Sequence, residues 1–75
     1  MYSTYKIKNL KDLHKLNKLA SHVDFDVYAS VNSTMVNAKS ILALLTVLGK
    51  EVRIIAPDHI DFSEFVQFVD KLKHQ

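Results

Sequence analysis

Cysteine and tryptophan are absent from this 75-residue sequence, and glycine and proline each occur only once. A chain without cysteine can form neither a disulfide scaffold nor a thiolate metal site, and such a composition is typical of a reducing compartment. With a single glycine, the chain has no glycine-rich loop of the kind that cradles phosphates in nucleotide-hydrolysing enzymes. We therefore expect a cytoplasmic protein that holds no cofactor.

Long apolar runs are also missing. Residues 1–8 contain no apolar segment of the kind found in signal peptides. The longest apolar stretch, from Ile41 to Leu48, is interrupted by Thr46 and falls far short of the roughly 20 residues that cross a membrane. The sequence therefore predicts a protein without membrane contact.

The charge of the chain is weak and unevenly distributed, with a net value of +2. Residues 1–39 carry six lysines against three acidic residues, whereas residues 40–75 carry four basic and five acidic residues. A dedicated nucleic-acid-binding protein would need a much stronger basic field, so we expect no nucleic-acid partner. The excess in the first half is sufficient to orient an encounter with an acidic protein surface.

The length and the apolar content of 48% indicate one soluble globular domain, residues 1–75. Alternating apolar and polar residues predict short strands, and apolar residues recurring every three or four positions predict helices. Strands are expected at residues 5–8, 25–31, 34–36 and 51–56, and helices at residues 9–22, at 37–48 and after residue 61. The order β-α-β-β-α-β-α, with one polar face on each strand, predicts an α+β open-faced sandwich. In this fold three helices cover one face of a four-stranded antiparallel sheet.

Two of the expected helices carry an apolar stripe that should face the core. The first stripe is Leu10, Leu13, Leu16, Leu19 and Ala20. The second, in the last helix, is Phe62, Phe65, Val66, Val69 and Leu72.

The segment from Asn37 to Leu45, with the sequence NAKSILALL, places a lysine and a serine at the start of an almost wholly apolar helix. This segment resembles the regulatory-serine helix of HPr, the histidine-containing phosphocarrier of the bacterial sugar phosphotransferase system. The order of the expected elements is also that of the HPr family, so the resemblance spans nearly the whole chain. It implies that Ser40 stands where HPr kinase phosphorylates HPr in many Gram-positive bacteria.

The resemblance breaks down at the family's active-site loop. Counting back from Ala20 and Ser21, Asn9 stands at the position of the family's phosphohistidine, Lys11 at its arginine and Asp12 at its proline. An amide offers no nucleophilic lone pair to a phosphoryl group. The resemblance therefore implies a degenerate HPr-like protein that has lost phosphocarrier activity and is not an enzyme.

His14 leaves an alternative open, a working phosphocarrier with a displaced histidine. Placing His14 in the active loop would remove more than one turn from the first helix. His14 and His22 are about 12 Å apart along that helix, which is too far for one ion, so we expect no metal site.

The second helix is the predicted partner-binding surface, because Ile41, Leu42 and Leu45 cannot all face one small sheet together with Leu44 and Leu48. An exposed apolar patch usually marks a partner site. By the resemblance, these three residues fall in the patch that docks the partners of HPr. The alternatives are homo-oligomerisation or contact with the last helix.

Lys11, Lys15 and Lys18 form a basic face on the first helix, which either meets acidic groups of a partner or is merely solvated. Lys39 is expected to belong to the same partner-binding surface. It stands next to Ser40, which is either a phosphorylation site or an ordinary helix cap. We expect a regulatory or protein-interaction module whose partners include HPr kinase or other phosphotransferase components. The alternative to any such link is a small homo-oligomerising α+β domain.

Overall fold

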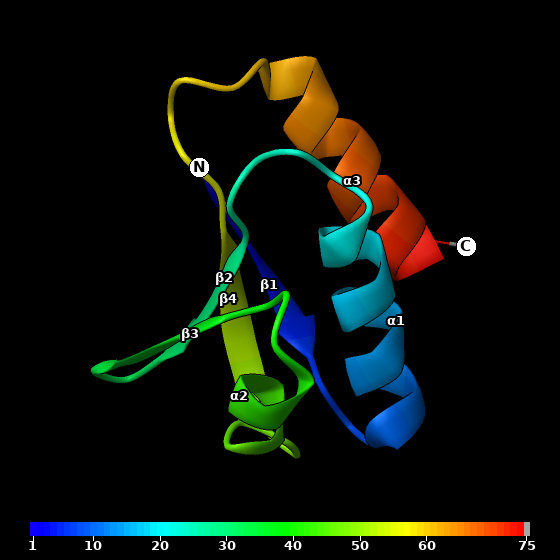
Figure 1. Ribbon diagram of the computed structural model, residues 1–75, viewed down its shortest axis with the longest axis vertical. Coiled ribbons are helices and arrows are strands. Elements are labelled where there is room, and N and C mark those ends of the chain that lie inside the picture. Colours follow the sequence, from blue (N-terminus) through cyan, green and yellow to red (C-terminus); the bar gives the residue numbers. More distant parts are fainter. Residues whose placement is uncertain (75) are drawn as a thin grey trace.

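The computed structural model describes residues 1–74. Its elements are β1 (Tyr2–Lys6), α1 (Leu10–Ser21), β2 (Tyr28–Val31), β3 (Thr34–Asn37), α2 (Ile41–Leu45), β4 (Glu51–Ile55) and α3 (Phe62–His74). The strands form one antiparallel sheet in the order β1-β4-β2-β3. Helices α1 and α3 lie side by side against one face of this sheet, and α2 lies at its end, in contact with α1 and β3 (Figure 1). The predicted open-faced sandwich is confirmed.

The core lies between the sheet and the helices and is made of apolar side chains. In β4, Val52 and Ile54 are buried while Glu51 and Arg53 are exposed, so one face of the sheet is covered and the other is open. The buried set is Ile7, Leu13, Leu16, Ala20, Phe25, Val27, Ala29, Ala38, Leu44, Val47, Val52, Ile54, Ala56, Phe65, Phe68 and Leu72. Every element except β1 and β3 contributes at least one residue of this set.

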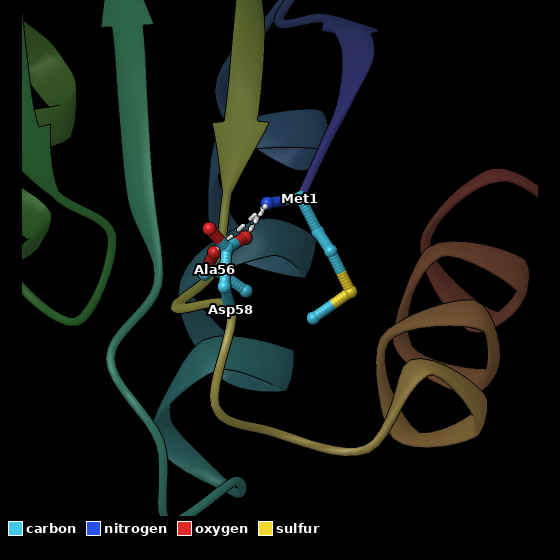
Figure 2. A network of polar contacts seen from close by, with 3 residues as sticks. All are labelled: Met1, Ala56 and Asp58. Atoms are coloured by element: carbon cyan, nitrogen blue, oxygen red, sulfur yellow. Dashed lines mark hydrogen bonds and ion pairs between the residues drawn. The ribbon is translucent and has the colours of Figure 1, made fainter.

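Strand β1 is an edge strand that pairs with β4, with Tyr2 opposite Ile55. The ladder continues one residue further, because the Ala56 amide donates to the Met1 carbonyl at 3.0 Å. The N-terminal ammonium of Met1 in turn donates to the Ala56 carbonyl at 3.3 Å and forms an ion pair with Asp58 at 2.8 Å (Figure 2). These contacts fasten the start of the chain to the segment that leaves the central strand.

The second helix is much shorter than the predicted 37–48. Asn37 ends β3, and its side-chain oxygen accepts a hydrogen bond from the Lys39 amide at 2.8 Å, which makes a turn before the helix begins. After Leu45 the chain continues in tight turns and reaches Gly49, whose φ of +87° suits glycine. Asparagine and serine therefore act here as turn and cap residues rather than helix interior.

The other differences concern the boundaries of the elements and members of both predicted apolar stripes. β1 begins earlier than predicted and ends at Lys6, and β2 begins only at Tyr28. In α3 the predicted stripe is partly wrong, because Phe62 and Val66 are exposed while Phe68 is buried. Phe68 lies three residues after Phe65 and meets Phe25 edge-to-face at a ring-centroid distance of 6.3 Å, so the helix turns that side toward the core.

Candidate protein-interaction surface

Helix α2 and the turn after it present an aliphatic patch to solvent. Its members are Ile41, Leu42, Leu45 and Leu48, with exposed fractions of 48%, 79%, 43% and 37%. Leu44 and Val47 of the same segment are buried and hold it on the core. We call these four exposed residues the α2 patch. The helical spacing predicts that these residues cannot all face the sheet, and Leu48, which was expected inside with Leu44, is also exposed.

The α2 patch is held on a hydrogen-bonded base. Ala38 is fully buried, and its amide donates to the Val27 carbonyl at 2.9 Å. Its carbonyl accepts from the Asn17 side chain of α1 at 3.2 Å. The segment that leads into α2 is therefore tied to both the sheet region and α1, which fixes the position of the patch relative to α1.

Ser40 is the N-cap of α2. Its side-chain oxygen accepts from the Ala43 amide at 3.2 Å, and its carbonyl accepts from the Leu44 amide at 3.0 Å. The side chain is half-buried. The ammonium group of the neighbouring Lys39 donates a hydrogen bond to the Val23 carbonyl at 3.1 Å and not to Ser40. Lys39 thus connects the α2 segment to the end of α1.

Asn9 is the N-cap of α1. Its side-chain oxygen accepts from the Asp12 amide at 3.0 Å, and the Asp12 carboxylate accepts from the Lys8 amide at 3.0 Å. The pair differs from a capping box, because the carboxylate accepts from the Lys8 amide and not from the amide of the cap residue itself. It satisfies two amides at the start of α1. Only Ile7, Lys8 and Asn9 connect β1 to α1, so no histidine lies in this connection. His14 lies within α1 and is exposed.

Tyr5 supports the same corner from β1. Its hydroxyl donates to the Asp12 carbonyl at 3.2 Å. Burial, with a smaller contribution from the negative charge of Asp12, raises the pKa of Tyr5 to about 12. The phenol therefore stays protonated and remains a hydrogen-bond donor at neutral pH.

The three lysines of the predicted basic face lie within about 60° of one another around α1, but they differ in burial. Lys11 and Lys18 are seven residues apart, both exposed, and share the outward side. Lys15 is half-buried and lines a depression together with residues of β1 and α3. Asn17, which contacts the α2 segment, lies on the opposite side of α1 from this depression. Lys11 and Lys18 are therefore the exposed members of the basic face.

Leu10 is an exposed apolar residue that the sequence pattern assigned to the core. It is 61% exposed, because it lies about 120° around the helix from the buried Leu16. Leu10 is seven residues before Asn17 and shares its side of α1, so it extends the apolar surface toward α2. Its angle around the helix and its position directly after a cap residue were signals in the sequence that could have indicated its exposure.

Within residues 1–74, no three His, Asp or Glu side chains are grouped so that they could hold a metal ion. None of the helices in the described part of the chain is long and apolar enough to cross a membrane.

Comparison with known proteins gives a similar fold and no sequence relative. The sequence matches no protein-family model and no curated protein. Among solved structures, the fold is similar to that of HPr-C-His from Thermoanaerobacter tengcongensis, with a TM-score of 0.71 and 20% sequence identity. The match covers 100% of this chain and 98% of that one. At this level of identity the likeness establishes an HPr-like fold.

Proposed function

We propose that this protein is an HPr-like protein-interaction module without phosphocarrier activity, which binds its partner through the α2 patch. The α2 patch is the observation that carries the proposal. Leu42 is 79% exposed although it lies in a helix whose neighbouring Leu44 is fully buried. Exposed aliphatic side chains gathered on one short segment favour a docking role.

The way the patch is held supports this role. Leu44 and Val47 anchor the segment in the core, while Ala38 is bonded to both Val27 and Asn17. A preformed surface loses little conformational entropy when a partner binds, so even a small patch can contribute useful affinity. The exposed Lys11 and Lys18 on α1 would add attraction to an acidic rim on the partner.

The corner around Asn9 supports the absence of phosphocarrier activity. The Asn9 side chain caps α1, and the three-residue connection before it holds no imidazole. A phosphoryl carrier needs a nucleophilic ring nitrogen at an accessible position. His14 remains the candidate for a displaced phosphohistidine, and mass spectrometry after phosphoryl transfer distinguishes it.

Regulation at Ser40 is the finer part of the proposal. The hydroxyl is at the mouth of α2, beside the exposed Ile41 and Leu42. A phosphate there would bring about two negative charges to the edge of the α2 patch and would alter any apolar contact made by it. The α2 patch and Ser40 would then form one switchable surface.

The direct test of the surface is titration with purified enzyme I and, separately, HPr kinase, monitored by NMR chemical shifts. We expect shifts centred on Leu42 and Leu45 with at least one of these proteins, and loss of binding in the double variant Leu42→Ser/Leu45→Ser. Phe62→Ser/Val66→Ser is the matched control, because these α3 residues are 69% and 46% exposed and lie outside the patch. Equal loss in both variants would contradict a specific α2 surface.

Intact mass after incubation tests the chemistry. With enzyme I and phosphoenolpyruvate we expect no added phosphate, and with HPr kinase and ATP we expect one phosphate that fragmentation assigns to Ser40. A phosphate on His14 in the first reaction would show a working carrier and overturn the proposal. Sedimentation showing a tight homodimer that buries the α2 patch would favour a homo-oligomerising domain instead.

A further inference from the structure

The edge strand β1 directs part of its backbone away from the sheet. β1 lies at one end of the sheet and pairs only with β4. Met1 and Ala56 exchange hydrogen bonds at 3.0 and 3.3 Å, and in an antiparallel ladder such exchanging pairs alternate with pairs that do not bond to each other. The amide and carbonyl groups of Tyr2, Thr4 and Lys6 therefore point away from β4. They form an edge to which a further strand could bond.

An apolar groove lies beside this edge, between β1 and α3. Its volume is about 360 Å³, within the range of about 300–1,000 Å³ that is usual for ligand sites. Phe62, Val66 and Val69 line it from α3, where they lie within about 60° of one another around the helix. Phe62 and Val66 are both exposed. The other lining residues are Tyr2, Ser3, Phe65, Asp70 and His74. We call this the β1–α3 groove.

The edge and the groove are held in a fixed relation by contacts of β1. The Lys73 ammonium donates to the Ser3 hydroxyl at 2.7 Å, which joins the end of α3 to β1. The guanidinium of Arg53, an exposed residue of β4, lies 5.4 Å from the centroid of the Tyr2 ring and holds this ring over the open face of the sheet. A preformed site of this kind loses little conformational entropy when a ligand binds.

We propose that the β1–α3 groove binds an extended peptide segment of a partner protein, which adds a fifth strand to the sheet antiparallel to β1. In this mode of recognition the backbone hydrogen bonds give affinity, and pockets for alternate side chains give specificity. Every strand pair of the sheet is antiparallel, so the added strand continues the existing pattern.

The residues around the site define the chemistry of the peptide. Its side chains opposite Met1 and Ser3 would point to the helix side of the sheet and enter the groove, so they should be apolar. Asp70 lines the groove and disfavours an acidic side chain inside it. The residue opposite the exposed Lys6 should be acidic, because opposite charges directly across two strands stabilise the pair. In an antiparallel strand this acidic residue precedes the apolar ones.

The site shares no residue with the α2 patch, so its failure and the failure of the proposed function are distinguishable. The test is titration of the full chain with the peptide acetyl-Glu-Thr-Thr-Val-Thr-Leu-amide, followed by NMR chemical shifts. In the proposed register its glutamate lies opposite Lys6, its valine opposite Ser3 and its leucine opposite Met1. We expect saturable one-to-one binding, with shifts at β1 and at the lining residues of α3.

Two N-methylated forms of this peptide test whether it binds as a strand. Methyl groups on the third and fifth residues remove the amides that would donate to Thr4 and Tyr2, and should weaken binding at least about tenfold. Methyl groups on the fourth and sixth residues lie on amides that point away from β1, and should change the affinity less than about threefold. Neither form alters the protein.

Proline substitutions test the edge from the side of the protein. Thr4→Pro removes an amide that points away from β4, which an edge strand tolerates, and should weaken peptide binding at least about tenfold. Met35→Pro is the matched control on the other edge strand, β3. The Ala38 amide bonds to the Val27 carbonyl, so alternation directs the Met35 amide outward as well. Met35→Pro should change peptide affinity less than about threefold.

The groove is tested by Phe62→Ser/Val66→Ser, which should weaken peptide binding, whereas Leu42→Ser/Leu45→Ser should leave it unchanged. Circular dichroism checks that each variant is folded, and the methylated peptides decide the question if Thr4→Pro is not. The proposal is overturned by the absence of saturable binding to the unmodified protein, by equal affinity for the two methylated peptides, or by equal weakening in the folded proline variants. A dimer in sedimentation that covers β1 and excludes the peptide would assign the edge to a second copy of this chain and would also overturn it.

Discussion

The contrast between Leu42 and Leu44 gives the sharpest test of how α2 is used. Leu44 is fully buried, so Leu44→Ala removes core contacts and leaves a cavity, at a cost of about 2–5 kcal/mol in the free energy of unfolding. Leu42 is 79% exposed, so Leu42→Ala should change that free energy by less than about 0.5 kcal/mol. Both substitutions place a good helix former in the same short helix, which removes backbone propensity as an explanation of the difference.

The expected effects are large on the scale of this chain. A domain of 75 residues typically has a free energy of unfolding of roughly 4–11 kcal/mol, so Leu44→Ala would remove a substantial part of the stability. For domains of this size about 1 kcal/mol lowers Tm by roughly 4–8 °C. We expect Leu44→Ala to lower Tm by at least about 8 °C and Leu42→Ala to lower it by less than about 4 °C.

Thermal and urea unfolding followed by circular dichroism measure both variants under the same conditions. A matched binding titration should show that Leu42→Ala weakens partner binding although it leaves the stability nearly unchanged, because the substitution removes a docking side chain of the α2 patch. If Leu42→Ala destabilised the fold as much as Leu44→Ala, Leu42 would be a core residue and the α2 patch would not exist as a free surface.

Three further predictions concern the ends of elements. Asn9→Ala removes the N-cap of α1 and should cost about 1 kcal/mol in urea unfolding, whereas Asn9→Asp should retain most of the stability. Tyr5 should titrate near pH 12 in an ultraviolet absorbance titration, and a Tyr5 pKa near 10 would contradict its burial. Because the folded-state pKa is raised, the contribution of Tyr5 to stability is fully present below its ordinary pKa of 10.0 and is lost as the pH rises toward 12. The hydrogen bond and charge of the Met1 ammonium hold the pKa of Asp58 below its ordinary value of 3.8. The contribution of Asp58 to folding stability is therefore present above pH 3.8 and is lost as the pH falls toward the folded-state pKa. Acetylation of the Met1 amine should return the NMR-measured pKa of Asp58 toward 3.8.

The sequence predicted correctly those elements in which the conformation favoured by the local residues is also the one that the folded chain adopts. The helix expected at residues 9–22 forms over Leu10–Ser21, with Asn9 as its N-cap. The two residues between the strands expected at 25–31 and 34–36 form a tight turn, with Asn32 at a φ of +54°. Helix α2 was predicted too long because its flanking residues are compatible with a helix by propensity. The pairing of Asn37 with Tyr28 places the start of the preceding flank in β3, and this contact is not visible in local sequence.

The candidate site was predictable only in part for a similar reason. Helical spacing alone indicated that Ile41, Leu42 and Leu45 could not all face the sheet together with Leu44 and Leu48, and all three are exposed. Spacing did not indicate that Lys15 would line a depression with Lys73, because that requires knowing that α1 packs beside α3. Binding by the α2 patch and modification of Ser40 stay predictions until they are measured.

The place of β4 in the sheet has a consequence for how the chain folds. β4 lies between β1 and β2, so residues 2 and 55 must meet before the first strand has a neighbour. During synthesis, β1 is made before its pairing partner β4, and the aliphatic α2 segment is made between them. Such non-local pairing slows folding relative to a helical bundle of equal size. A nascent chain that ends before Glu51 would contain the β2–β3 hairpin but no complete sheet. The α2 patch and the normally buried Leu44 and Val47 would then be exposed together, which favours aggregation.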